Sequence, residues 1–179
     1  MAVSVAISDI SVKYGDKYKV EYAGPKNLKP TVNRKNGVLT IKQSASGVHH
    51  VNSDLTIAIT VPKQLLKNVT LSTNDGDIEV ENIATTNSIS VDTNDGDIDI
   101  TNLRAPNGKI NTNDGDININ KLISKNGFKV NTDDGDIKVS NSSFTGYRLD
   151  TSDGDIKVKD SSSSSTFIDN KNLSLIHIS

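Results

Sequence analysis

The stretch Thr93-Asn-Asp-Gly-Asp-Ile98 decides the fold of this chain, because its pattern occurs five times in the sequence. The other four copies are Thr73–Ile78, Thr112–Ile117, Thr132–Ile137 and Thr151–Ile156. Successive copies begin 20, 19, 20 and 19 residues apart. Self-similarity at such a regular period indicates a repeat protein in which each unit is one supersecondary element.

Aliphatic residues keep a constant distance from each copy: one precedes each Thr by two residues, and one follows each Ile by two residues. These residues are Leu71, Val91, Ile110, Val130 and Leu149, and Val80, Ile100, Ile119, Val139 and Val158. Alternation with period two and many β-branched residues predict a strand on each side of the repeat. We expect each unit to contain a strand, a tight turn at Asp-Gly, a second strand and a loop. A positive φ is expected at the turn glycines Gly76, Gly96, Gly115, Gly135 and Gly154.

Two all-β architectures fit a unit of this length. In a β-solenoid (β-helix) each unit is one coil, and equivalent residues of successive coils stack about 4.8 Å apart. In an antiparallel β-meander of repeated hairpins, each hairpin would place Ile110 opposite Ile119. A hairpin constrains only partners across one turn, whereas stacked coils explain why equivalent positions match in every unit. The sequence therefore predicts a β-solenoid of 19–20-residue coils, with the meander as the alternative.

Sequence patterns divide the chain into three parts. Residues 1–71 lack the repeat but contain strand-like segments, and they are expected to form N-terminal β lead-in coils. Residues 72–160 are the five-repeat β-solenoid. Residues 161–179 hold a run of five serines and an atypical tail, Leu173–Ser179, that fits no repeat position. This tail, together with a start that lacks an export signal, predicts a truncated piece of a longer protein.

Charge and composition exclude several classes of protein. Residues 1–71 carry ten Lys and Arg against four Asp and Glu, while residues 72–160 carry nine against seventeen. Neither part has the single-sign density of a nucleic-acid binder, and aromatic residues make up only 4% of the chain, so no nucleic-acid partner is expected. No apolar run approaches the roughly 18 residues of a membrane span. The absence of Cys excludes disulfides and thiolate zinc sites.

Stacked Asp-Gly-Asp turns would create two columns of carboxylates. The columns are Asp75, Asp95, Asp114, Asp134 and Asp153, and Asp77, Asp97, Asp116, Asp136 and Asp155. An EF-hand is excluded, because aligning its glycine on Gly96 places the apolar Val91 at the first ligand position. We expect each Asp to hydrogen-bond its own turn backbone and assign no metal or cofactor site. Calcium bound at the stacked turns remains an alternative, since charges 4.8 Å apart in water repel by about 0.9 kcal/mol per pair.

No group of residues predicts catalysis, and no catalytic residue is assigned. The column Thr73, Thr93, Thr112, Thr132 and Thr151 offers one Thr per coil, whereas a flat ice-binding face would need two. The only arginines are Arg34, Arg104 and Arg148, and His49-His50 follows Gly47 in an expected exposed loop. A cleft holding two carboxylates with Arg104 or Arg148 would favour a carbohydrate-active enzyme. The chain is predicted not to be an enzyme.

The repeated Thr-x-Asp-Gly-Asp-Ile-x-Val phrase resembles the bacterial putative-adhesin family of β-strand-repeat proteins, a domain of unknown function. The upstream segments Tyr14–Pro25, Gly37–Ile41 and Leu55–Pro62 look like that family's lead-in to the repeats, so the resemblance covers residues 8–160. It implies a β-solenoid, an extracytoplasmic or envelope-associated location, mainly in Gram-positive bacteria, and adhesion or envelope-stress sensing. The family has no established catalytic residues to transfer.

These observations predict a non-enzymatic protein of the bacterial cell surface or envelope. Its repetitive faces of Asn, Asp, Ser and Lys would contact an unknown protein or polysaccharide partner. Self-association through the solenoid ends is a secondary expectation, because strand edges are exposed there. The alternatives from other classes are a carbohydrate-active β-helix enzyme and a calcium-stabilised structural scaffold.

Overall fold

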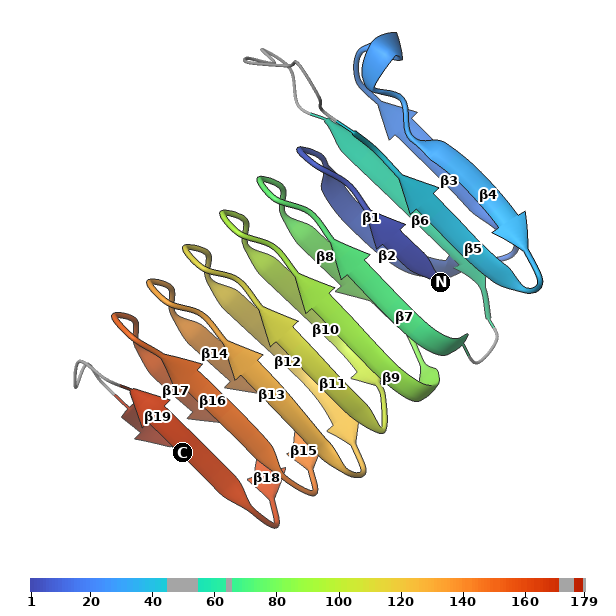
Figure 1. Ribbon diagram of the computed structural model, residues 1–179. Helices are drawn as coiled ribbons and strands as arrows, with labels where there is room; N and C mark the ends of the chain where they lie inside the picture. Colours follow the sequence, from blue (N-terminus) through green and yellow to red (C-terminus); the bar gives the residue numbers. More distant parts are fainter. Residues whose placement is uncertain (45–54, 64–65, 171–175, 179) are drawn as a thin grey trace.

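The chain folds into a stack of parallel coils, and successive coils add strands to two facing sheets (Figure 1). This computed structural model describes residues 1–44, 55–63, 66–170 and 176–178. In one sheet, β9 (Thr85–Asp92) pairs in parallel with β7 (Leu66–Ser72) and with β11 (Asn107–Asn111). The strand between β9 and β11 in the chain, β10 (Ile98–Arg104), lies in the other sheet. The predicted β-solenoid is confirmed, and the antiparallel meander is wrong.

The two sheets, called sheet A and sheet B, have nine and eleven strands in the described part of the chain. The order in sheet A is β19 (Thr166–Asn170), β16 (Tyr147–Thr151), β13 (Gly127–Asn131), β11, β9, β7, β1 (Ala2–Ser4), β5 (Val38–Lys42) and β4 (Thr31–Lys35). The order in sheet B is β20 (Ile176–Ile178), β17 (Ile156–Lys159), β14 (Ile137–Ser140), β12 (Ile117–Ser124), β10, β8 (Ile78–Glu81), β2 (Asp9–Gly15), β6 (Thr56–Pro62) and β3 (Lys19–Ala23). Beside this path lie β15 (Ser143–Phe144) and β18 (Ser162–Ser163), and the one helical segment among the described residues is the 3-10 turn η1 (Lys26–Leu28).

The first coil of the chain is not at the end of the stack. Strand β1 lies between β5 and β7, and β2 lies between β6 and β8, so the coil β1–β2 is inserted between two coils that follow it in sequence. Strands β3 and β4 pair antiparallel with β6 and β5 and close this end of the solenoid. Figure 1 shows β3 and β4 at the outer edge, beyond β5 and β6.

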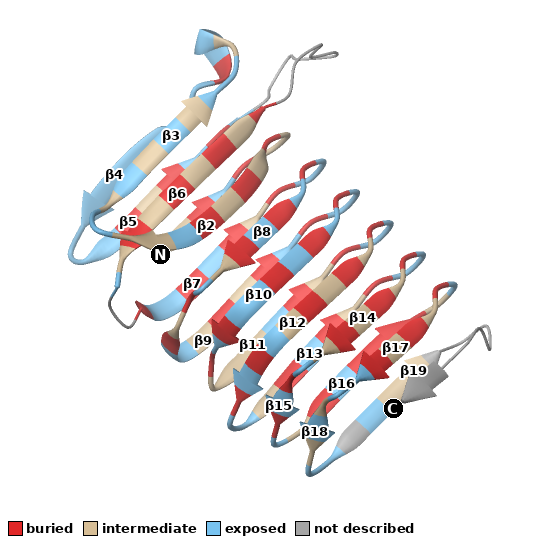
Figure 2. Ribbon diagram, turned by 180° about the vertical axis from the view of Figure 1, so that it is seen from behind, coloured by how far each residue is buried: buried red, intermediate tan, exposed pale blue. Residues whose placement is uncertain are grey.

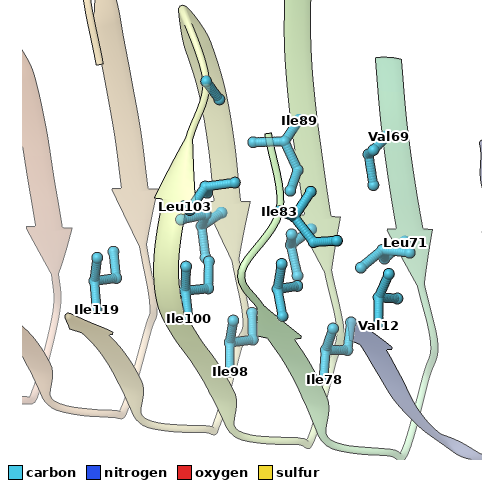
Figure 3. Close-up of a cluster of buried hydrophobic side chains, with 14 of the residues drawn as sticks. Val12, Val69, Leu71, Ile78, Ile83, Ile89, Ile98, Ile100, Leu103 and Ile119 are labelled. Atoms are coloured by element: carbon cyan, nitrogen blue, oxygen red, sulfur yellow. The ribbon is translucent and has the colours of Figure 1, made fainter. Parts of the chain in front are cut away.

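The core consists of aliphatic columns between the two sheets. Ile78 stacks on Ile98, which stacks on Ile117, and the equivalent residues of later coils continue the column. All are at most 1% exposed. Figure 3 shows Ile78, Ile98 and their neighbours between the sheets, and Figure 2 shows buried and exposed residues alternating along the strands. Burying one such side chain stabilises the fold by about 1.5–3 kcal/mol, which makes these narrow columns sufficient as a core.

A residue in the left-handed conformation directly follows β8, β14 and β17 and lies within β10 and β12. One residue per coil adopts a positive φ there, between 48° and 60°. The column is Asn82, Asn102, Lys121, Asn141 and Asp160. Asn and Asp tolerate this conformation better than most residues, so an Asn or Asp four residues after the repeat Ile, present in four of the five coils, was the available sequence signal. In β10 and β12 the chain continues in sheet B beyond this residue, since Leu103 pairs with Leu122 and Arg104 with Ile123.

The tail does not behave as the sequence pattern predicted. Residues Leu173–Ser179 were expected to fit no repeat position, yet Ile176 pairs in parallel with Ile156 and Ile178 with Val158. Ile176–Ile178 therefore continue the stack at the same register as the repeats. His49-His50 lies outside the described residues. In the part of the chain that the structure describes, no helix has the length and hydrophobicity that crossing a membrane requires.

Candidate functional site

The first residue of each repeat is a threonine, and its side chain hydrogen-bonds to the backbone of the preceding coil. The Thr93 hydroxyl donates to the carbonyl oxygen of Gly76 at 3.0 Å, and the Thr112 hydroxyl donates to that of Gly96 at 2.9 Å. Each of the five threonines is at most 2% exposed. Because the column is buried, it cannot form the exposed face that binding to ice would require.

The turn glycine is needed for a different reason from the one predicted. Among the described glycines, only Gly24 and Gly37 have a positive φ, so the expectation of a positive φ at the five turn glycines is wrong. A Cβ on Gly96 would lie 2.0 Å from the carbonyl oxygen of Gly76, and a Cβ on Gly115 would lie 2.0 Å from that of Gly96. Glycine is required because the turn of one coil packs directly on the backbone of the previous turn.

The second carboxylate of each repeat joins neighbouring coils. Oδ1 of Asp77 accepts a hydrogen bond from the backbone N–H of Asp97 at 2.8 Å, and Oδ1 of Asp97 accepts one from Asp116 at 2.8 Å. The ladder begins at Asp9 and reaches the backbone of Asp155. We expected each Asp to bond its own turn, and the structure corrects this for the ladder: the partner lies one coil further along.

Hydrogen bonding within this ladder favours the ionised carboxylate. The pKa of Asp136 lies below its usual value, first because the backbone N–H of Asp155 donates to it and then because Lys138 lies beside it. The Nζ of Lys138 lies 3.2 Å from Asp116 and 3.3 Å from Asp136. The second carboxylate column is therefore occupied by structural contacts along much of its length.

The first carboxylate of each repeat is exposed and forms an acidic ridge, defined as Asp75, Asp95, Asp114, Asp134 and Asp153. The pKa of Asp134 is raised, first by partial loss of hydration and then by the charges of Asp153 and Asp114. This ridge is where a cation would reduce repulsion. Within the described ranges, no group of three or more His, Cys, Asp or Glu side chains has the geometry of a metal site.

The outer face of sheet A carries a basic column, defined as Lys109, Lys129 and Arg148. The three residues occupy equivalent positions in successive strands, since Lys109 pairs with Lys129 and Lys129 with Arg148. All three are exposed. Equivalent residues of paired strands are about 4.8 Å apart, so the column presents a closely spaced row of cations parallel to the solenoid axis.

A carbohydrate-active enzyme would be expected to hold two carboxylates beside an arginine, and the surroundings of Arg148 are the part of the described structure most similar to that arrangement. The Nε of Arg148 donates to Asp150 Oδ2 at 2.6 Å, and its guanidinium lies 3.8 Å from Asp169 and 4.4 Å from the centre of the Phe167 ring. Lys129 lies 3.8 Å from the same Asp150 oxygen. Lys129, Arg148, Asp150 and Asp169 line a hollow of about 200 Å³. Arg104 lies elsewhere, at the edge of the solenoid, and takes no part in this cluster.

Stacked parallel coils, inter-coil threonine and aspartate bonds and flat polar faces together define a β-solenoid repeat protein. The chain belongs to the Toastrack DUF4097 family, whose model matches residues 1–172. The resemblance found in the sequence is thereby confirmed. No curated protein matches the chain.

A solved structure has a similar fold. It is the crystal structure of a putative adhesin from Bacteroides fragilis, with a TM-score of 0.64 and 18% sequence identity. The similarity covers 99% of this chain and 91% of that chain. At this low sequence identity, the comparison shows that the two chains share a fold.

Proposed function

We propose that this chain is a non-enzymatic binding module of the bacterial cell surface or envelope, located outside the cytoplasm. Its partner would be a protein or a polysaccharide bound along a polar sheet face. The membership of the Toastrack DUF4097 family and the adhesin name of the structural neighbour support this proposal. The observation that carries it is the basic column of Lys109, Lys129 and Arg148 on the outer face of sheet A.

A linear polyanion is the partner that this column favours. Cations in a row along a rigid sheet match a chain with regularly spaced negative groups, and such contacts weaken as salt screens them. Lys109 has no ion pair within the described part of the chain, whereas Arg148 is held by Asp150. Lys109 is therefore the side chain most available to an anionic cell-wall polysaccharide, followed by Lys129, whose Nζ lies 3.8 Å from Asp150 Oδ2.

Sedimentation with purified Gram-positive cell walls tests this function. We expect the chain to pellet with the walls at low salt and to be released as salt rises. The double variant Lys109→Gln with Lys129→Gln should bind several-fold more weakly, because each lost contact to an anion removes up to about 1 kcal/mol. The matched control is Lys13→Gln with Lys159→Gln, which removes the same charge from sheet B.

Equal loss of binding in both double variants would show that net charge, and not the sheet A column, determines attachment. Absence of wall binding in the unaltered chain would overturn the surface-binding proposal. The cluster of Arg148, Asp150 and Asp169 is the observation that favours a carbohydrate-active enzyme. Release of reducing ends from the cell-wall polysaccharide in the same experiment would contradict the non-enzymatic proposal.

A further inference from the structure

A pocket of about 420 Å³ opens at the edge of the solenoid that lies away from the Asp-Gly-Asp turns. Three consecutive coils form it where the chain passes from sheet B to sheet A. The first coil contributes Thr85 and Thr86, the second Arg104, Ala105 and Pro106, and the third Ile123 and Lys125. Its size is within the range of pockets that bind small ligands, about 300–1,000 Å³.

The floor and one wall of this pocket are apolar. Ala105 is buried, and Ile123 leaves 42% of its surface exposed at the rim. Thr85 is 4% exposed, and its hydroxyl oxygen is covered and has no hydrogen-bond partner within the described residues. Exposed aliphatic surface gathered around a cavity is typical of a site that contacts an apolar group.

The repeat shows that Ile123 is particular to this coil. Ile123 pairs with Ser143 of the next coil, and Ser143 pairs with Ser162 of the coil after it. The preceding members of the same column are Arg104 and Ala84. A serine therefore satisfies the backbone requirements of this position, and an isoleucine contributes an apolar wall that the fold itself does not demand.

Two cations lie at the rim of the pocket. Arg104 and Lys125 are both exposed, and neither forms an ion pair with any residue that the structure describes. Unpaired cations beside an apolar cavity disfavour a cationic ligand and attract an anionic one. The complement of this surface is a molecule with an apolar body and a negative head group.

We propose that this pocket binds an amphipathic carboxylate, with an aliphatic chain of medium length against Ile123 and Ala105. The carboxylate would lie between Arg104 and Lys125, where a guanidinium can donate two parallel hydrogen bonds. This site is independent of the basic column on sheet A, since the two surfaces share no residue.

Octanoate titrated into the whole chain, with methyl resonances followed by NMR, tests the proposal. Saturable shifts are expected at Ile123, and octanol and octyltrimethylammonium should bind several-fold more weakly or not at all. Arg104→Gln with Lys125→Gln should weaken octanoate binding about fivefold, as expected when exposed charge contacts are lost. Ile123→Ser should weaken it about tenfold, because the lost apolar contact amounts to roughly two methylene groups.

The matched control for charge is Lys26→Gln with Lys29→Gln, two exposed lysines at the capped end of the solenoid. This control should bind octanoate as tightly as the unaltered chain, and Ile123→Ser should keep the thermal midpoint because serine occupies the position in later coils. Octanol binding as tightly as octanoate, or shifts spread over both sheets, would overturn the proposal. Loss of cell-wall sedimentation with intact octanoate binding would contradict only the surface function.

Discussion

At Gly115 the space for a side chain is already filled by a neighbouring turn. Its Cβ position lies 2.0 Å from the carbonyl oxygen of Gly96 and 2.5 Å from the carbonyl carbon. Backbone atoms cannot rotate away as a flexible side chain can. A methyl group at this position would have to separate two coils, which would also strain the Thr and Asp bonds between them.

We therefore expect Gly115→Ala to destabilise the protein by about 1–3 kcal/mol or more, the usual cost of overpacking. The control is Gly127→Ala, because the nearest atom to a Cβ at Gly127 is 3.7 Å away, an ordinary contact. Urea denaturation of the two variants measures the difference. Equal urea midpoints for the two variants would show that close stacking of the turns is not the reason for glycine at position 115.

Residue-scale contacts between coils were only partly predictable from sequence. The columns of Thr, Gly and Asp were visible, because identical residues at one period must occupy equivalent places. Their partners were not visible, since a period alone does not say whether Asp77 bonds its own turn or the backbone of Asp97. Asp9 begins the same ladder without belonging to any repeat, and no pattern marked it.

Among the elements, β4 is one of the strands that end a sheet. Within the described residues it pairs with β5 alone, and all five of its residues, Thr31–Lys35, are exposed. Arg34 stacks over the Tyr18 ring at 4.4 Å, and Lys35 ends the strand. Charged side chains on an edge strand are a common protection against pairing with another chain.

Arg34→Thr with Lys35→Thr should promote self-association through this edge, because it replaces two cations with residues that favour strands. Light scattering after size-exclusion chromatography should show a mass that rises with protein concentration. Lys13→Thr with Lys109→Thr removes the same charge from strands that are paired on both sides, and this control should not associate more than the unaltered chain. Association of both variants alike would point to lost net charge instead of the open edge.

At the element scale, the repeat predicted the strands of the second half and their parallel stacking. The order of the first half was not predictable, because local patterns identify a strand without identifying its neighbours. Strand β1 illustrates this, since its partners β5 and β7 are contributed by residues far along the chain. Likewise, alternation gave no sign that Ile176–Ile178 would join the stack.

Over the whole molecule, the acidic ridge is an extended electrostatic feature that runs through all five repeats. Its carboxylates, from Asp75 to Asp153, are exposed on one side of the stack, and neighbouring charges raise the pKa of Asp134. Water and salt screen such exposed charges strongly. The scaffold is already joined by the Thr and second-Asp bonds, which need no ion.

We expect the thermal midpoint to be the same in calcium as in sodium at matched ionic strength, and unchanged by a chelator. Differential scanning calorimetry measures it directly. A rise specific to calcium that disappears in Asp114→Asn with Asp134→Asn would instead support the calcium-stabilised scaffold. Asp92→Asn with Asp99→Asn is the matched control, since it removes two carboxylates outside the ridge.

The inserted coil β1–β2 makes the two ends of the solenoid mechanically unequal. A pull on the C-terminal end meets coils held on one side by a single neighbour, so they can peel away one after another. A pull on the N-terminal end loads β1 and β2, which are held by neighbours on both sides in both sheets. Several backbone ladders must then shear together before the chain yields. We therefore expect the coils to unfold one after another when force is applied at the C-terminal end, and to resist together when it is applied at the N-terminal end.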